Sequence, residues 1–251
     1  MARQLIAGNW KMNGLLADGI ALAKALVERV GDGSATSGEW LICPPTALLN
    51  PISEVLAGSA VALGGQDCHG AASGAHTGDT SARLLADLGC RYVIVGHSER
   101  RSDHGEGDAL VKAKAQSAIE AGLRPIVCVG ETHAERDEGR ALQVIESQLR
   151  GSLPLDGDLV VAYEPVWAIG TGLTATASDV AEVHAQIHQL LQELLGAEKA
   201  LETRILYGGS VKPANAAELL QVPYVGGALV GGASLKAEDF WAIGAAAAGG
   251  S

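Results

Sequence analysis

The strongest constraint on the fold is a regular alternation along the whole chain, in which short apolar segments of the strand type are separated by segments with helical spacing. We predict eight strands, at Leu5–Asn9, Trp40–Cys43, Val61–Leu63, Tyr92–Gly96, Pro125–Val129, Leu159–Glu164, Ile205–Tyr207 and Gly227–Val230. Two helical stripes are clearest, at Leu16, Ile20, Ala23, Val27 and Val30, and at Val180, Val183, Ile187, Leu190 and Leu194. Such alternation is typical of a parallel sheet with right-handed crossovers.

The number and size of these units favour a closed barrel. Eight pairs in 251 residues give one strand–helix pair per ~31 residues, close to the length of a βαβ unit. An open doubly wound sheet has the same content, and counting supplies no strand order, so it stays as the alternative. No linker or low-complexity stretch divides the chain, so we expect one α/β domain, a single (β/α)8 barrel, over residues 1–251.

Composition excludes several classes of protein. With 47% apolar and 19% charged residues the chain is not of the disordered type. A net charge of −11 argues against a nucleic-acid binder. The four cysteines form no C-x-x-C pair, and we find neither a secretory signal nor an apolar run of 18 residues. We therefore expect a cytoplasmic protein that associates with neither nucleic acid nor membrane.

Polar side chains stand where three of the predicted strands end, and in a parallel barrel the carboxyl ends of the strands carry function. Asn9 and Lys11 share the face of Leu5 at the first strand, and a cation there would attract an anion. We assign His97 to the face of Val93 and Val95 and expect it to project inward, where it could polarise a carbonyl or move protons.

Glu164 follows the sixth strand, and partial burial would raise its pKa and suit it to act as a general base. Each of these residues also has a structural interpretation. Lys11 could be a solvated strand end and His97 a structural histidine, and Glu164 could form an ion pair with an arginine.

The loops after strands six to eight complete the candidate site. The apolar segment Val166–Gly172 lies between a proline and a glycine, which is typical of a lid that excludes water. It comprises Val166, Trp167, Ala168, Ile169, Gly170, Thr171 and Gly172. The paired glycines before Ser210, and the pair Gly231 and Gly232, would let backbone N–H groups approach a phosphate.

Three other patterns are weaker. His184 and His188 have metal-ligand spacing on a helix but lack a third ligand nearby, so we assign them to an outer helix face. Gly170-x-Gly172 lacks the context of a dinucleotide motif, and Cys128 is interpreted as a small buried residue.

Five segments, in order and spread over the chain, resemble the triosephosphate isomerase family. They are Asn9–Asn13, Gly96–Arg101, Ala162–Gly172, Tyr207–Val211 and Val230–Leu235. The resemblance implies a TIM barrel that acts in glycolysis and gluconeogenesis. Its reaction would interconvert dihydroxyacetone phosphate and glyceraldehyde 3-phosphate through an enediolate, without a metal or cofactor.

The resemblance also implies roles for individual residues. Glu164 would be the base, His97 a neutral donor to the substrate oxygens, Lys11 the stabiliser of the oxyanion, and Asn9 a further donor, with Glu99 orienting Lys11. Backbone N–H groups of Gly170, Ser210, Gly231 and Gly232 would hold the phosphate, and the lid would close over it.

A homodimer is implied through the loop Asp67–Ser81, with Thr77 near the partner's active site. The chain departs from the family's common residues at His76, Asp67, Leu173 and Gly226, in the dimer loop, after the lid and before strand eight. Two alternative functions stay open at this point. They are another phosphate-binding barrel, such as an aldolase or a synthase, and a non-catalytic scaffold.

Overall fold

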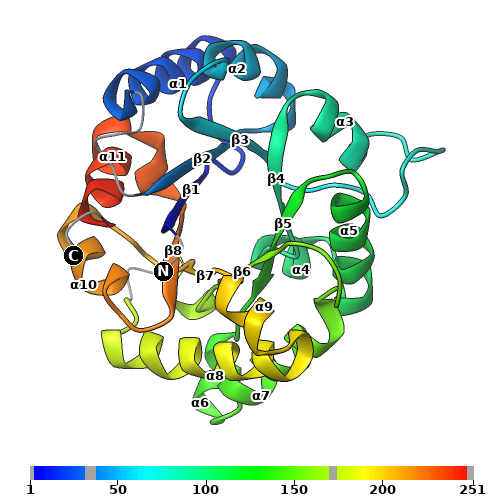
Figure 1. Ribbon diagram of the computed structural model, residues 1–251, viewed down its shortest axis with the longest axis vertical. Helices are drawn as coiled ribbons and strands as arrows, with labels where there is room; N and C mark the ends of the chain where they lie inside the picture. Colours follow the sequence, from blue (N-terminus) through cyan, green and yellow to red (C-terminus); the bar gives the residue numbers. More distant parts are fainter. Residues whose placement is uncertain (1–2, 32–37, 170–173, 248–251) are drawn as a thin grey trace.

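The computed structural model describes residues 3–31, 38–169 and 174–247, and its central feature is a closed barrel of eight parallel strands in sequence order (Figure 1). The strands are β1 Leu5–Asn9, β2 Glu39–Cys43, β3 Val61–Gly65, β4 Cys90–Val95, β5 Arg124–Val129, β6 Val160–Tyr163, β7 Ile205–Tyr207 and β8 Val225–Val230. Every strand pairs in parallel with the next, and β1 pairs with β8. The open-sheet alternative is therefore wrong.

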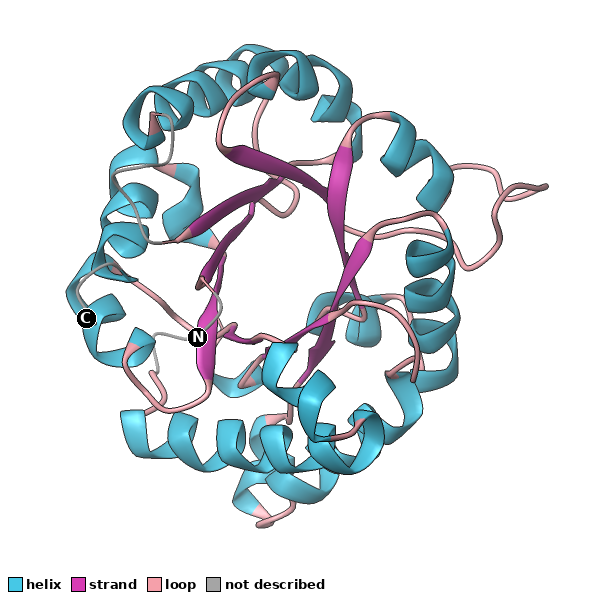
Figure 2. Cartoon of the chain, viewed as in Figure 1, coloured by secondary structure: helices cyan, strands magenta, loops and turns pink. Residues whose placement is uncertain are grey.

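At least one helix follows each strand, and the helices form a ring around the barrel (Figure 2). They are α1 Leu16–Val30, α2 Leu49–Leu56, α3 Ala82–Asp87, α4 Ser98–Asp103, α5 Asp108–Glu120, α6 His133–Asp137, α7 Ala141–Ser152, α8 Ala177–Leu195, α9 Ala197–Glu202, α10 Pro213–Leu220 and α11 Ala237–Ala246. A capping box starts α8, where Thr176 and Asp179 exchange side-chain and backbone hydrogen bonds.

Two apolar layers stabilise this arrangement. Alternate strand residues such as Leu5, Leu41 and Ile94 fill the barrel interior, whereas their neighbours pack outward against the helices. In α1 the predicted stripe is buried at Ala23 and Val30. Gly19 and Leu26 are also buried, whereas Leu16 is exposed. The stripe predicted for α8 is buried as far as Leu190.

The placement of His97 corrects one step of the sequence argument. Val93 and Val95 belong to the outer layer that faces the helices, so strict alternation from them would turn His97 outward. The strand instead ends at Val95, and Gly96 takes a φ of 65°. A Cβ atom at Gly96 would come within 2.6 Å of Val111. This left-handed glycine breaks the alternation and directs His97 into the barrel mouth. The inward direction expected for His97 is therefore right, although the face from which it was argued is not.

Candidate active site

The carboxyl ends of the strands surround a cavity of about 570 Å³. The predicted residues that line it are Asn9, Lys11, His97, Glu164, Ile169, Ser210, Gly231 and Gly232. Residues from five strand ends and their loops, far apart in sequence, thus meet in one place. Gly170, Thr171 and Gly172 lie outside the described residues.

Lys11 is held in an uncommon backbone conformation at the end of β1. Its φ is 52°, in the left-handed region. The Lys11 N–H donates to Asn9 Oδ1 at 3.0 Å, and the Gln66 amide donates to the Lys11 carbonyl at 2.8 Å. Its ammonium pairs with Glu99 Oε1 at 2.5 Å. These contacts direct the cation to the cavity, which Asn9 also lines.

Glu164 and His97 meet inside the cavity. Glu164 is 2% exposed, with Oε1 2.8 Å from His97 Nε2 and Oε2 accepting the Ser98 N–H at 3.0 Å. Burial alone would raise the pKa of Glu164, but the contacts with His97, Ser98 and Lys11 lower it below its ordinary value. The predicted rise in the pKa of Glu164 is therefore wrong for this arrangement of the side chains.

The His97 ring is fixed by the start of α4. Its Nδ1 accepts the Glu99 N–H at 3.2 Å, so the neutral ring carries its proton on Nε2, the nitrogen that faces the cavity. Burial lowers the pKa of His97, whereas the adjacent Glu164 carboxylate outweighs that effect and raises it. Whether the ring is charged therefore depends on where the Glu164 carboxylate lies.

The described part of the predicted lid begins with a short 3-10 helix, Val166–Ala168. Trp167 donates from Nε1 to Glu131 Oε1 at 2.8 Å, and the Arg136 guanidinium lies 4.8 Å from its ring centroid. Ala168 is buried, and the residues around it are half-buried. Ile169 reaches the cavity.

The glycine pairs after β7 and β8 lie together on one side of the cavity. A Cβ atom at Gly209 would lie 2.2 Å from the Tyr207 hydroxyl, whereas one at Gly232 would meet no atom within 4 Å. Gly209 is therefore required for packing. At Gly232 the open space leaves room for a ligand to approach the backbone.

Sequence reasoning missed three charged residues that line the outer part of the cavity, namely Lys212, Lys236 and Asp239. They lie at or near the starts of α10 and α11, and their only sequence signal was proximity to the glycine pairs. Of the charged cluster that follows His97, only Glu99 pairs with Lys11. Arg100 contacts Glu106 and Asp67 instead, and Arg101 contacts Asp108.

The prediction that the histidine pair of α8 lies on an outer face is wrong for His184. His184 is fully buried, with Nδ1 3.4 Å from the Tyr224 carbonyl, and burial lowers its pKa to about 4. His188 stacks on the Tyr224 ring at 4.4 Å. Cys128 lies in the barrel interior beneath the site, as a small buried residue.

One group of potential metal ligands occurs among the described residues, away from the cavity. Atoms of His69, His76 and Asp79 lie within 4.8 Å of one another. The Ala71 N–H donates to His69 Nδ1 at 3.0 Å, which leaves the ring proton on the nitrogen that faces Asp79. This geometry favours an imidazole–carboxylate contact over metal ligation. The helices that the structure describes also include none with the length and hydropathy that crossing a bilayer requires.

A (β/α)8 barrel with a carboxylate, an imidazole and glycine-lined loops at the carboxyl ends of its strands defines the class of phosphate-binding barrel enzymes. The comparisons with known proteins are more specific. The family model described as triosephosphate isomerase matches residues 4–247. The chain belongs to the triosephosphate isomerase family.

Similar proteins agree with this assignment over nearly their full length. The triosephosphate isomerase of Afipia carboxidovorans is 59% identical over 250 residues, covering 96% of each chain. That of Acidiphilium cryptum is also 59% identical and covers 98% of each. Among solved structures, triosephosphate isomerase from Bartonella henselae superposes with a TM-score of 0.88 at 48% identity, covering 96% of this chain and 97% of that one.

Proposed function

We propose that this chain interconverts dihydroxyacetone phosphate and glyceraldehyde 3-phosphate by proton transfer through an enediolate. The single observation that carries the proposal is the meeting of Glu164 and His97 at 2.8 Å inside a cavity whose other side is formed by the glycine-rich loops. Membership of the triosephosphate isomerase family supports the same reaction. The fold and this site fit a single-domain glycolytic isomerase of the cytoplasm.

Glu164 is the proposed base. It would leave the Ser98 N–H and His97, take a proton from the substrate carbon beside the carbonyl, and return it to the neighbouring carbon. The buried position makes this movement productive, because a carboxylate that loses its hydrogen bonds in a dry site becomes more basic. The low pKa of Glu164 in the free protein then keeps it ionised before substrate arrives.

His97 is the proposed donor to the two substrate oxygens. With its proton on Nε2 and the Glu99 N–H on Nδ1, the neutral ring donates toward the cavity. Departure of the Glu164 carboxylate toward the substrate removes the contact that raises the pKa of His97, and this favours the neutral ring. A neutral imidazole in this role is established for the triosephosphate isomerase family.

Lys11 and Asn9 would stabilise the negative charge that develops on the substrate oxygen and the charge of the bound phosphate. Glu99 fixes the direction of the Lys11 ammonium through their ion pair. For the phosphate, we assign the backbone N–H groups of Ser210, Gly231 and Gly232, together with Gly170. Closure of the lid, Val166–Gly172, would keep water from the enediolate.

We also propose a homodimer that forms through the loop between β3 and α3. This loop projects from the barrel (Figure 1), and its residues 72–79, including Thr77, are exposed. Large apolar side chains are exposed on other segments as well. They include Met12 at 96%, Leu15 at 75% and Leu84 at 46%. A second copy of the chain is the partner that the family resemblance implies.

A coupled assay of triose phosphate isomerisation on the purified protein tests the proposed reaction. Phosphoglycolate, which mimics the enediolate, should stabilise the protein against heat, and sedimentation at several concentrations should show a dimer. A scaffold would show neither turnover nor stabilisation. An aldolase with a Schiff-base lysine would be trapped by borohydride in the presence of its substrate, and that result would replace the proposed function.

A further inference from the structure

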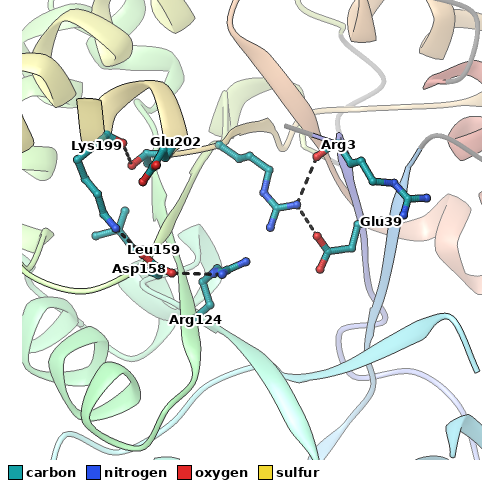
Figure 3. A pocket seen from close by; sticks show the side chains of 9 residues that line it. Arg3, Glu39, Arg124, Asp158, Leu159, Lys199 and Glu202 are labelled. Atoms are coloured by element: carbon teal, nitrogen blue, oxygen red, sulfur yellow. Dashed lines mark hydrogen bonds and ion pairs between the residues drawn. The ribbon is translucent and has the colours of Figure 1, made fainter. Parts of the chain in front are cut away.

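The opposite end of the barrel, where the strands begin, holds a second cavity of about 380 Å³ (Figure 3). This volume lies within the range of small-ligand sites, roughly 300–1,000 Å³. We call this cavity the N-terminal mouth. It is lined by Arg3, Glu39, Arg124, Asp158, Leu159, Lys199, Glu202, Thr203 and Arg204. None of these residues has a place in the proposed isomerase reaction.

Two guanidinium groups converge on one oxygen at the bottom of the mouth. Arg204 Nη2 donates to the Tyr92 hydroxyl at 2.6 Å, and Arg124 Nη1 donates to the same oxygen at 3.1 Å. Tyr92, whose ring lies in the barrel interior, donates its own proton to Glu39 Oε1 at 2.6 Å. The tyrosine thus brings two positive charges together over a neutral acceptor.

The carboxylates that line the mouth do not accept hydrogen bonds from all N–H donors of its basic side chains. Glu39 pairs with Arg204, while Asp158 is shared by Arg124 and Lys199. Among the described residues, Arg124 uses two of its five N–H donors, on Tyr92 and Asp158, and the Lys199 ammonium pairs with Asp158 alone. The lining contains four basic and three acidic side chains, a local excess of positive charge in a protein of net charge −11.

We propose that the N-terminal mouth is a second binding site, which takes a small multiply charged oxyanion, a polycarboxylate or a phosphorylated compound. The oxyanion would accept the remaining N–H donors of Arg124 and Arg204 and contact the Lys199 ammonium. Planar guanidinium groups suit both kinds of anion, because each presents paired donors to two oxygens. This inference goes beyond the proposed function and is independent of it.

The basic side chains at the rim of the N-terminal mouth are partly exposed, which distinguishes the mouth from a closed ionic network. The Arg204 side chain is 10% exposed and is fixed at the bottom, whereas Arg124 is 40% and Lys199 31% exposed at the rim. A ligand can therefore reach the rim donors without disrupting the buried contact between Arg204 and Tyr92. Asp158, 62% exposed, is the carboxylate that competes most directly with an incoming anion.

Isothermal titration with citrate, and separately with inorganic pyrophosphate, tests the site. Phosphoglycolate at saturation first occupies the active site, so that only a second site contributes heat. We expect one anion per chain, with an affinity that falls as salt rises. The anion that binds more tightly decides between a polycarboxylate and a phosphorylated ligand.

Substitutions at the rim should shift the affinity in opposite directions. Arg124→Met should weaken anion binding about tenfold or more, because it removes charge-assisted hydrogen bonds. Asp158→Asn should strengthen it severalfold, because it removes the competing charge. Lys24→Met, at an exposed position of α1 remote from the mouth, is the matched control for net charge and should change nothing.

Isomerase activity serves as the folding control, since the active site lies at the other end of the barrel. If Arg124→Met does not fold, Lys199→Met replaces it with the same expected direction. The proposal is overturned if neither anion binds at millimolar concentration, or if the rim substitutions leave the affinity unchanged. In that case the mouth is a structural ionic network only.

Discussion

Replacing Glu164 with Asp moves the proposed base without removing its charge. The backbone at Glu164 packs closely against that of Gly130, where an added Cβ atom would lie 1.7 Å from the Glu164 carbonyl oxygen. Gly208 packs from the other side, where a Cβ atom would lie 2.9 Å from Glu164 Cγ. The carboxylate must therefore retract by about the length of one C–C bond, ~1.5 Å.

This displacement sets the expected size of the effect. Misplacing a reacting group by about 1 Å costs about 10²-fold in rate, and complete loss of a general base costs about 10²–10⁴-fold. We expect kcat for Glu164→Asp to fall about 10²–10³-fold, with a much smaller change in KM, since no phosphate contact is altered. The coupled isomerase assay in both directions measures both constants.

The control for this substitution is Glu182→Asp, at an exposed position of α8. It makes the same chemical change and should leave kcat unaltered. Melting temperature and phosphoglycolate binding show that the Glu164→Asp protein is folded and keeps its site. A folded Glu164→Asp protein with kcat within threefold of the original would refute the assignment of Glu164 as the base.

Three further predictions follow from the geometry. Gly96→Ala should lower the free energy of unfolding, measured in urea, by about 2–4 kcal/mol, because Gly96 has a φ of 65° and its new Cβ atom would lie 2.6 Å from Val111. The control, Gly105→Ala, should lower it by only about 1–2 kcal/mol, because Gly105 has a similar φ of 67° but its new Cβ atom would meet no atom within 4 Å. Equal costs would contradict the packing argument. Burial lowers the pKa of His184 from 6.5 to about 4, so between these values the unfolded chain binds a proton that the native one does not. Stability should therefore fall by about 3 kcal/mol as pH drops from 7 to 4, and His184→Gln should remove this part of the pH dependence in denaturant titrations; an unchanged slope would contradict it. Lys11→Met should lower kcat/KM at least about 10²-fold and abolish thermal stabilisation by phosphoglycolate, and retained stabilisation would show that Lys11 does not hold the anion.

The alternation of apolar segments was sufficient to predict every strand of the barrel, because strands buried on both faces leave a strong local signal. It could not decide between a closed and an open sheet, since closure depends on the pairing of β1 with β8, which no local pattern records. The boundaries were less accurate. The fourth strand was predicted to include Gly96, but β4 ends at Val95. The left-handed conformation of Gly96 places His97 on the side opposite to Val93 and Val95.

The polar side chains that line the candidate site could be proposed from sequence because each stands at a strand end, but their electrostatics could not. The pKa of Glu164 depends on Ser98 and His97, which lie about one quarter of the chain away in sequence and come into contact only when β4 and β6 take their places in the barrel. Burial, the one effect that the sequence indicated, acts in the opposite direction to these contacts. The buried position of His184 was missed for a similar reason, since its surroundings come from the segment that contains Tyr224.

Net charge was the least informative property, and the structure explains why. The chain carries −11, yet the proposed substrate is a dianion and the proposed ligand of the N-terminal mouth is also an anion. At physiological ionic strength, charges farther apart than about 8 Å are largely screened. The charged side chains that line the candidate site are therefore what an anion meets there, and Lys11, Lys212 and Lys236 outnumber Glu164 and Asp239. Basic side chains from several strands and helices meet at the two ends of the barrel. The acidic residues that give the chain its net negative charge lie mostly elsewhere. The sign of a ligand is thus set by the few side chains that the barrel brings together and not by the sum over the chain.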